Sequence, residues 1–376
     1  MKPRVALLTT SLDRGGAEAQ VALLAAGLAR RGYQTCVISL AAPTAFTADL
    51  KDAGVEVVSL SMRAGVADPR GLGRLLRFLA RFRPAIVHSH LFHANLMARV
   101  ARLLAPVPVV ISTLHSVAES GRRHPGVGLR DLAYRLSDPL ADQVVAVCEA
   151  VSRRHLAAGA VGASKLCVIP NAVDTGVFRP DVERRAAMRQ ALELDGAFVW
   201  LAAGRLMWKK DYPTLLRAFA SRSSSVLLVA GAGPQGEQLK DLASRLGVRV
   251  RWLGAREDMP ALMNAADALV LSSVVEGLPV VLLEAAASGL IAVSTDAGGA
   301  REAVEDGVTG YIVPLGDAEA LSQAISRVES LDETARQQMA RAARRRALAL
   351  FDIQAVTGRW ERLYGELLER ARRQLG

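Results

Sequence analysis

Two glutamates, Glu276 and Glu284, are the residues of this sequence whose type and spacing most directly suggest chemistry. Glu276 lies in a loop that runs to Pro279, and Glu284 is the only charge in the following segment of Val, Leu and Ala. An ionised carboxylate among such neighbours costs free energy unless hydrogen-bond donors surround it. A sugar diol offers two O–H donors to a group that only accepts. The alternative is that Glu284 meets a backbone N–H or an arginine.

A second set of residues has the chemistry to bind a diphosphate. Gly15 and Gly16 precede a predicted helix over 17–31, and glycines at such a point let the free N–H groups of a helix approach a phosphate closely. Arg205 and Lys210 follow a predicted strand; Arg offers a planar fork of donors and Lys a point charge. A structural Gly-Gly turn and ordinary surface charge are the alternatives.

Histidines form a third set. His88, His90 and His93 stand close together at the end of a predicted strand and raise the question of a metal site. No carboxylate or cysteine completes a ligand set, so we expect them to line a cleft between two domains instead. His115 follows the predicted strand 109–113 and is expected to face the same cleft. A loop histidine with satisfied hydrogen bonds is its alternative reading.

The elements that must position these residues alternate between apolar strands and helices. This alternation is typical of an α/β protein, in which a parallel sheet is covered on both faces. It begins again at Phe198, which indicates two similar halves. We expect two facing Rossmann-like domains with a deep inter-domain cleft: 1–170 for the acceptor, 171–351 for the donor, and a last helix over 352–376 that crosses back to the first domain. The basic, Gly-rich segment 119–135 suits a mobile acceptor loop.

Composition narrows the functional classes. The chain has 376 residues, and no apolar run approaches the ~20 residues of a membrane span. The three cysteines lie singly in apolar runs, which indicates reduced core residues and a cytoplasmic protein. Only 5% of residues are aromatic, which argues against nucleic-acid binding by stacking.

The net charge of +10 has two readings, solvated helix faces or contact with an anionic membrane or lipid-linked acceptor. From Ala335 onward there are ten Arg against four acidic residues. Arg74, Arg77 and Arg81 form a basic stripe on a helix predicted over 72–82. The same helix packs apolar residues on its other side, so a solvated basic face is the default and membrane contact the alternative.

Several motifs together resemble the retaining family-4 glycosyltransferases over almost the whole chain. Glu276 and Glu284 resemble the family's E-x7-E motif, with Gly277, Leu278 and Pro279 after the first glutamate. Departures are small: Ala172 replaces a Gly in the hinge motif and Asp211 replaces a Gly in the cationic loop. Further matching segments are Gly15–Glu18, 170–174, 204–211, Gly298-Gly299 with Glu302, and 307–314.

The resemblance implies the GT-B fold and a retaining, hexosyltransferase-type activity. The enzyme would move a sugar from a nucleoside-diphosphate sugar to a glycan, lipid-linked or polyprenol-linked acceptor, in polysaccharide or glycoconjugate synthesis. It implies no cofactor and no metal, and a cytoplasmic location with peripheral contact at the membrane as one reading. The implied catalytic residues are His115, Glu276, Arg205 and Lys210; the implied donor-binding residues are Gly15, Gly16, Arg205, Lys210, Arg256, Met259, Glu276, Gly277, Leu278, Pro279, Val280 and Glu284.

Within that set the resemblance assigns roles. Glu284 would hold the ribose, Glu276 and His115 would contact the sugar, and Arg205 and Lys210 would neutralise the departing diphosphate. Arg256 would stack on the base while the backbone of Met259 reads its edge.

Other classes remain open. A sugar-nucleotide epimerase shares the two-domain plan, and a silent sugar-nucleotide-binding protein would share the site. A glycoside hydrolase would use two carboxylates but not the cationic loop, and a dehydrogenase would show G-x-G-x-x-G after the first strand. The base, the sugar, the acceptor and the oligomeric state are not indicated.

Overall fold

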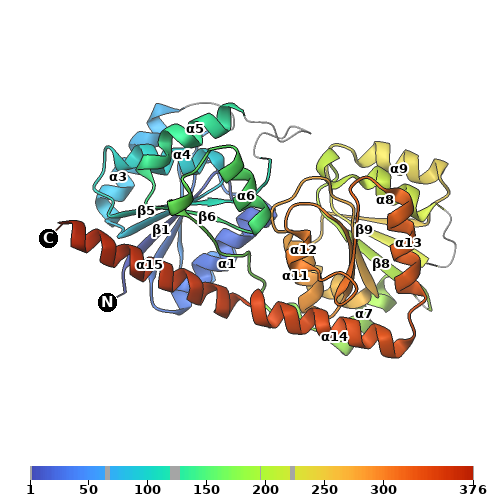
Figure 1. The fold of residues 1–376 in the computed structure, drawn as a ribbon. Helices are drawn as coiled ribbons and strands as arrows, with labels where there is room; N and C mark the ends of the chain where they lie inside the picture. Colours follow the sequence, from blue (N-terminus) through green and yellow to red (C-terminus); the bar gives the residue numbers. More distant parts are fainter. Residues whose placement is uncertain (1, 64–67, 119–127, 195, 221–224, 376) are drawn as a thin grey trace. The chain divides into compact units, whose positions relative to one another are not determined.

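The computed structural model describes residues 2–63, 68–118, 128–194, 196–220 and 225–375 (Figure 1). The chain forms two compact units. Unit 1 comprises Met1–Ala172 together with Ile353–Gly376, and unit 2 comprises Val173–Asp352. Each unit has its own parallel sheet, its own core and its own covering helices. The segment after Asp352 therefore belongs to the unit that the N-terminus begins.

Unit 1 is built on a seven-stranded parallel sheet in the order β3-β2-β1-β4-β5-β6-β7 over the described residues. Its strands are short apolar runs, as expected for a sheet that is buried on both faces. They are β1 (Arg4–Thr9), β2 (Gln34–Ser39), β3 (Glu56–Ser59), β4 (Ile86–His90), β5 (Val109–Leu114), β6 (Gln143–Ala146) and β7 (Leu166–Val168).

Helices pack on both faces of this sheet. One face is covered by α1 and α15, which contribute Leu28, Trp360 and Tyr364 to a core with the inward residues of β1, β4 and β5. The other face carries Phe78 of α3 and Ala98 of α4. The helices are α1 (Gly16–Arg30), α2 (Thr47–Asp52), α3 (Pro69–Phe82), α4 (Phe92–Arg102), α5 (Leu129–Ser137), α6 (Glu149–Ala157) and α15 (Ile353–Leu375), with 3-10 turns η1 (Asp138–Leu140) and η2 (Ala163–Lys165).

Unit 2 repeats the plan with a six-stranded parallel sheet in the order β10-β9-β8-β11-β12-β13 over the described residues. Its strands are β8 (Phe198–Ala203), β9 (Ser225–Ala230), β10 (Val250–Gly254), β11 (Ala268–Leu271), β12 (Ile291–Thr295) and β13 (Gly310–Val313). Its helices are α7 (Val182–Ala191), α8 (Tyr212–Phe219), α9 (Gly236–Arg245), α10 (Met259–Ala265), α11 (Val280–Ala287), α12 (Ala300–Ala303), α13 (Ala318–Glu329) and α14 (Glu333–Leu350), with the 3-10 turn η3 (Trp208–Lys210). Trp200 of β8 is fully buried in the core of this unit.

Both sheets contain a point where the strand order reverses. In unit 1 it lies between β1 and β4, and in unit 2 between β8 and β11. At such a point the loops beyond the two strands diverge to opposite faces, and ligands bind in the crevice between them. The predicted α/β class with two Rossmann-like units is confirmed, and the loops after β1, β4, β8 and β11 lie at the two switch points.

The structure corrects one expectation about a particular segment and adds to another. The expected acceptor loop 119–135 is not a loop throughout: residues 119–127 lie outside the described residues, and Leu129–Ser137 forms α5. Tyr134 of this helix is fully buried, and Asp131 accepts the N–H of Gly128 at its start, so packing and a cap both favour the helix. The basic stripe on α3 is also partly neutralised, because Arg74 pairs with Asp68 and Arg81 with Glu56.

Candidate functional site

An ion pair joins the two loops at the switch point of unit 2. Lys210 Nζ donates to Glu276 Oε1 at 2.6 Å, across 66 residues of chain. Lys210 follows β8 and Glu276 follows β11, the two neighbouring strands from which the order diverges. Their side chains keep 20% and 15% of their surface, so the pair is partly accessible. The structure thus brings together the residues predicted to handle the diphosphate and the sugar.

Backbone contacts hold the two loops in this position. Ser272 Oγ donates to the carbonyl of Lys210 at 2.7 Å, and the N–H of Val274 donates to the carbonyl of Lys209 at 2.8 Å. The hydroxyl of the buried Tyr212 donates to the carbonyl of Gly204 at 3.0 Å. Burial raises the pKa of this phenol, with the nearby Glu276 adding to the effect, so it remains a donor at neutral pH.

Two glycines place the loop that carries Glu276. Gly298 has φ +56°, and a Cβ on it would lie 2.5 Å from the carbonyl oxygen of Glu276 and 2.6 Å from that of Gly277. The N–H of Gly299 donates to the Gly277 carbonyl at 2.6 Å. Only glycine permits both the positive φ and this backbone approach. Gly298 and Gly299 therefore hold the backbone of the Glu276 loop in place through direct contacts.

Arg205 lies in the same cationic loop as Lys210 but remains exposed. Within the part of the chain that the structure describes, its guanidinium has no hydrogen bond or ion pair. A guanidinium is permanently charged and presents donors in a planar fork. Arg205 is therefore a cation available to an anionic ligand, whereas Lys210 already compensates Glu276.

Glu284 lies in α11, one turn beyond its start. Val280, Val281 and Glu284 share the one incompletely buried face of this helix, while its other residues are buried in unit 2. No described residue donates a hydrogen bond or forms an ion pair with its carboxylate. Burial raises the pKa of Glu284 to about 7. The expected alternative, a structural backbone or arginine partner, is thus not what the described residues provide.

The start of α11 adds backbone donors. Pro279 occupies the N-cap position without a side-chain hydrogen bond, and Val280 and Val281 are the first helical residues. N–H groups in the first turn have no partner within the helix. Together with the helix dipole they favour a negative group near Pro279. Gly277 and Leu278, which lead into this turn, are buried.

Arg256 and Met259 follow β10, the edge strand of the sheet, separated from β8 by β9. Arg256 forms a two-point interaction with Asp258, 2.8 Å and 2.5 Å, and this interaction raises the pKa of Arg256. Met259 is the first residue of α10. The ion pair orients the guanidinium plane, and the Arg256 side chain keeps 30% of its surface exposed. The roles of Arg256 and Met259 in binding the base remain predictions.

In unit 1, Gly15 and Gly16 lie where the sequence predicts, at the start of α1 beyond β1. The carboxylate of Glu18 folds back over this turn: Ser11 Oγ donates to it at 3.0 Å, and a Cβ on Gly15 would lie 2.3 Å from its Oε2. A carboxylate of the chain therefore lies beside the N-terminus predicted to receive a phosphate. The role of Gly15 and Gly16 stays a prediction.

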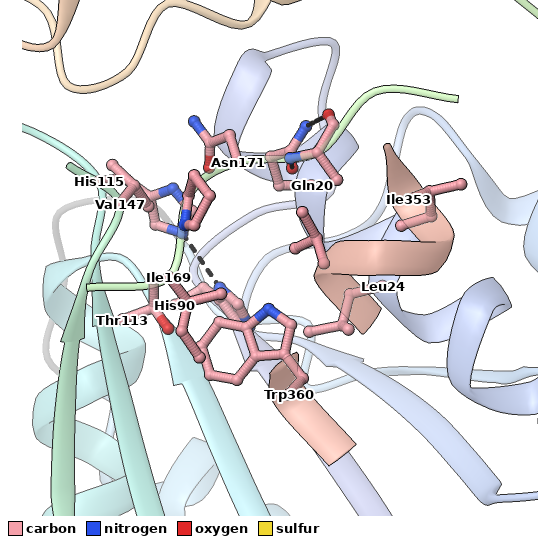
Figure 2. A pocket seen from close by; sticks show the side chains of 13 residues that line it. Gln20, Leu24, His90, Thr113, His115, Val147, Ile169, Asn171, Ile353 and Trp360 are labelled. Atoms are coloured by element: carbon pink, nitrogen blue, oxygen red, sulfur yellow. Dashed lines mark hydrogen bonds between the residues drawn. The ribbon is translucent and has the colours of Figure 1, made fainter. Parts of the chain in front are cut away.

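His115 is the first residue after β5 and is partly exposed. Its Nε2 lies 3.0 Å from Nδ1 of His90, the last residue of the neighbouring β4 (Figure 2). His88 is fully buried: its ring nitrogens bond to Tyr364 and Thr113, both at 2.7 Å. Burial lowers the pKa of His88 to about 3 and that of His115 to about 4.

The expectation that the three clustered histidines line a cleft is therefore wrong for His88, which belongs to the core of unit 1. Sequence reasoning also missed that His90 contacts His115. The signal was available, because both residues lie just beyond the ends of predicted strands, 86–89 and 109–113, that are consecutive in the chain. No group of three or more potential metal-ligating side chains is found among the described residues.

Family models match both halves of the chain. Residues 14–177 match the model described as Glycosyltransferase Family 4, and residues 183–346 match the one described as Glycosyl transferases group 1. The two matches together span most of unit 1 and most of unit 2.

Individual proteins agree with the family models. The UDP-Gal:alpha-D-GlcNAc-diphosphoundecaprenol alpha-1,3-galactosyltransferase of Escherichia coli is 28% identical over 278 residues, covering 70% of this chain and 71% of the relative. A D-inositol 3-phosphate glycosyltransferase of Actinosynnema mirum is 29% identical, with 84% of each chain covered.

Solved structures have a similar fold. HepE of Anabaena, in complex with UDP, has a TM-score of 0.82 at 25% identity, covering 97% of this chain and 100% of that one. Sucrose-phosphate synthase of Thermosynechococcus elongatus has a TM-score of 0.84 at 20% identity, with 98% and 100% covered, which shows likeness of fold.

Proposed function

The chain belongs to the glycosyltransferases of family 4 and group 1, and from this premise we propose that it is a retaining hexosyltransferase. The donor is a nucleoside-diphosphate sugar, and the acceptor is a hydroxyl of a glycan or of a lipid-linked sugar. Retention is proposed from the spacing of Glu276 and Glu284, which resembles the E-x7-E motif of retaining enzymes.

The observation that carries the proposal is the set of charges at the switch point of unit 2. Among the described residues, Arg205 and Glu284 have no hydrogen-bond or ion-pair partner. Lys210 and Glu276 form an ion pair with each other. A free cation suits a diphosphate, and a partly buried carboxylate without donors suits a ribose diol. An unligated protein keeps a buried carboxylate without donors at a cost in stability, so the presence of Glu284 supports a nucleotide-sugar site.

The reaction breaks the bond between the sugar's anomeric carbon and the diphosphate oxygen and forms one to the acceptor oxygen. The nucleoside diphosphate leaves with the bonding electrons, and an oxygen of the departing diphosphate takes up the proton of the acceptor hydroxyl. Negative charge grows on the leaving oxygen, where Arg205, Lys210 and the N–H groups of Val280 and Val281 stabilise it. Since these groups supply the positive charge, we propose that no metal ion is required.

The acceptor class is proposed from chemistry and from the relatives. The galactosyltransferase named above acts, by its name, on a diphosphoundecaprenol-linked sugar. In this chain, α5 exposes Leu129, Leu132 and Leu136 by 86%, 48% and 73%, and these residues share one side of the helix at spacings of three and four. We propose that this side of α5 contacts the cytoplasmic face of a membrane that carries a lipid-linked acceptor.

We propose membrane contact at α5 and not at the basic stripe of α3. In that stripe, Arg74 and Arg81 are paired with acidic residues. The net charge of +10 favours an anionic lipid surface. Separately, none of the helices in the described part of the chain combines the length and apolarity that crossing a bilayer requires.

Donor binding tests the central proposal. Melting curves are recorded with UDP-, GDP-, ADP- and dTDP-sugars, and one of them should raise the melting temperature. A ligand present at 100 times its Kd stabilises the folded protein by about 2.7 kcal/mol.

Incubation with acceptor extracts then separates the classes of enzyme: transfer yields a glycosylated lipid or glycan, a hydrolase releases free sugar, and an epimerase changes the sugar of the nucleotide. Transfer in EDTA equal to that in Mg²⁺ supports the metal-free reaction. Absence of any stabilisation by all four donors would contradict the proposal.

Vesicle sedimentation tests the membrane surface. The wild type should bind anionic vesicles at low salt and lose binding as salt rises. Replacing Leu132 and Leu136 by Ser should weaken binding, whereas Leu348→Ser on α14, a residue exposed by 43%, serves as a control. Equal binding to neutral and anionic vesicles, or equal effects of both replacements, would remove α5 from the interface.

A further inference from the structure

His90 is a buried residue with no role in the proposed reaction, yet it contacts His115, to which the family resemblance assigns a catalytic role. Its Nδ1 lies 3.0 Å from Nε2 of His115, with ring centroids 5.3 Å apart. His90 is 2% exposed, whereas His115 is partly exposed beyond the end of β5. Figure 2 shows the pair beside Thr113 and Trp360.

Both rings are neutral at physiological pH. Burial lowers the pKa of His115 to about 4 and holds that of His90 well below its usual value, and the neighbouring His88 adds to the second effect. A hydrogen bond between two neutral imidazoles needs a hydrogen on one nitrogen and a lone pair on the other. The pair therefore has two arrangements, which differ in the tautomer of both rings.

The surroundings of His90 Nε2 decide between them. This nitrogen is buried and has no hydrogen-bond partner among the described residues. A buried N–H without an acceptor is rarer and costlier than a buried bare acceptor. The favoured arrangement therefore has the hydrogen on Nδ1 of His90, which donates to Nε2 of His115.

A small pocket beside the pair is compatible with this arrangement. It measures about 20 Å³ and is lined by polar side chains of Gln20, Thr113 and Asn171 as well as by Trp360. One water molecule needs about 10–15 Å³. The pocket has room for one water; because a water can donate or accept, its presence is compatible with the favoured arrangement but does not select it.

The core restricts rotation of the His90 ring. The ring of His88 packs against it at an interplanar angle of 37° with centroids 4.2 Å apart, and Trp360 of α15 packs against His88 at 42° and 4.5 Å. His88 is itself fixed by hydrogen bonds at both ring nitrogens. The donor on His90 is thereby held at a fixed direction toward His115.

We propose that His90 is a positioning residue that keeps His115 in the tautomer with its hydrogen on Nδ1. The inference rests on the proposed function together with the role that the family resemblance implies for His115, contact with the donor sugar. In this tautomer Nε2 of His115 is occupied as an acceptor and Nδ1 carries a hydrogen. His115 then presents an N–H donor to the sugar and has no lone pair with which to remove the proton of the acceptor hydroxyl. A general-base role for His115 is excluded by the same arrangement.

Nitrogen-15 NMR of the imidazole rings tests the tautomer without any substrate. The wild type should show His115 protonated at Nδ1 at pH 7, His90→Phe should show a mixture, and His90→Asn, which retains an amide donor near Nδ1, should resemble the wild type. His115 found in the Nε2–H form, or unchanged in His90→Phe, would overturn the inference. This readout is independent of turnover, so failure of the protein to transfer sugar would count against the proposed function alone.

Kinetics test the consequence. His90→Phe should lower kcat about tenfold, as expected for one lost hydrogen bond, with a donor KM within about twofold of wild type. His90→Asn should recover most of the rate, and His90→Phe should have no further effect in a His115→Ala background. Phe78→Leu, in the core on the opposite face of the same sheet, controls for destabilisation of unit 1. Equal losses in His90→Phe and Phe78→Leu, or additive losses with His115→Ala, would overturn a role through His115.

Discussion

At the scale of single residues, the pairing of Lys210 with Glu276 sets the charge of the candidate site. A carboxylate beside a diphosphate would repel it, and the ammonium of Lys210 compensates that charge at 2.6 Å. An ammonium has three N–H donors, so Lys210 can keep Glu276 and still donate to a phosphate oxygen. Arg205, without a described partner, supplies further positive charge. The proposed roles of these three residues are therefore compatible with the unligated geometry.

The two glutamates should respond differently to replacement. Glu284→Gln is expected to weaken binding of the bare nucleoside diphosphate about ten- to a hundredfold, because a hydrogen bond to a charged group contributes about 1.5–3 kcal/mol. Glu276→Gln should leave that binding nearly unchanged and lower kcat, because its contact strengthens as charge develops on the sugar. Isothermal titration and initial rates measure both. Equal weakening of nucleotide binding in the two variants would contradict these assignments.

Glu284 should also make stability depend on pH. Its pKa is raised from 4.5 to about 7 in the folded protein. The stability contributed by its neutral form is fully present below about pH 4.5 and is lost as pH rises through about 7. Glu284→Gln stays neutral, so it should be more stable than wild type at pH 8, by roughly 1–3 kcal/mol, and equal to it at pH 4.

Denaturant titration of wild type and Glu284→Gln at the two pH values measures this difference. Glu276→Gln is the control, since Glu276 has Lys210 as a partner. A difference between wild type and Glu284→Gln that is independent of pH would show that folding does not raise the pKa of Glu284.

At the scale of elements, the loops beyond β8, β11 and β12 form one assembly. The β11 loop bonds to the β8 loop through Ser272 and Val274, and the turn before α12 supports it through Gly298 and Gly299. Thr295, at the end of β12, adds a hydrogen bond from its hydroxyl to the carbonyl of Ser273 at 2.6 Å. The position of Glu276 therefore depends on residues well beyond its own loop.

Gly298→Ala tests that dependence. The new Cβ would overlap the carbonyl oxygens of Glu276 and Gly277, so the loop must move and kcat should fall by about tenfold or more. Gly307→Ala is the matched control, with φ +75° but no atom within 4 Å of its Cβ. Both variants should lose about 1 kcal/mol or more of stability through the positive φ.

Melting temperature and kcat of the two glycine variants are compared. Equal kcat in both, despite similar destabilisation, would mean that the Gly298 contact does not position Glu276.

At the scale of the whole molecule, each unit has its own core, and each core contains one deeply buried tryptophan. Trp360 of α15 is 5% exposed in unit 1, and Trp200 of β8 is 0% exposed in unit 2. Replacing a buried tryptophan by Ala costs about 3–5 kcal/mol. Trp360→Ala should therefore destabilise unit 1, and Trp200→Ala should destabilise unit 2.

Limited proteolysis with mass spectrometry assigns the loss to a unit. Trp360→Ala should expose sites within 2–172 first, and Trp200→Ala sites within 173–352. Nucleotide protection of unit 2 should persist in Trp360→Ala. Simultaneous opening of both units in either variant would show that they unfold as one cooperative body.

The sequence alone determined the class of the fold and the loops that matter. Short apolar runs alternating with amphipathic segments predict parallel sheets, because period and burial are local properties of the chain. Chemistry-bearing residues directly after such runs, among them Arg205, Glu276 and His115, are at the carboxyl ends of strands whatever the strand order. The lone charge of Glu284 in an apolar helix could also be identified from the sequence, because the apolar pattern of a helix is a local property of the chain.

Only the tertiary structure decided which of these residues meet. The order of the strands places β8 beside β11 and β4 beside β5, and so pairs Lys210 with Glu276 and His90 with His115. The return of α15 to unit 1 seals His88 behind Tyr364, where the sequence predicted a cleft residue. These contacts join positions far apart in the chain. Their geometry depends on how whole elements pack, and local sequence patterns do not determine that packing.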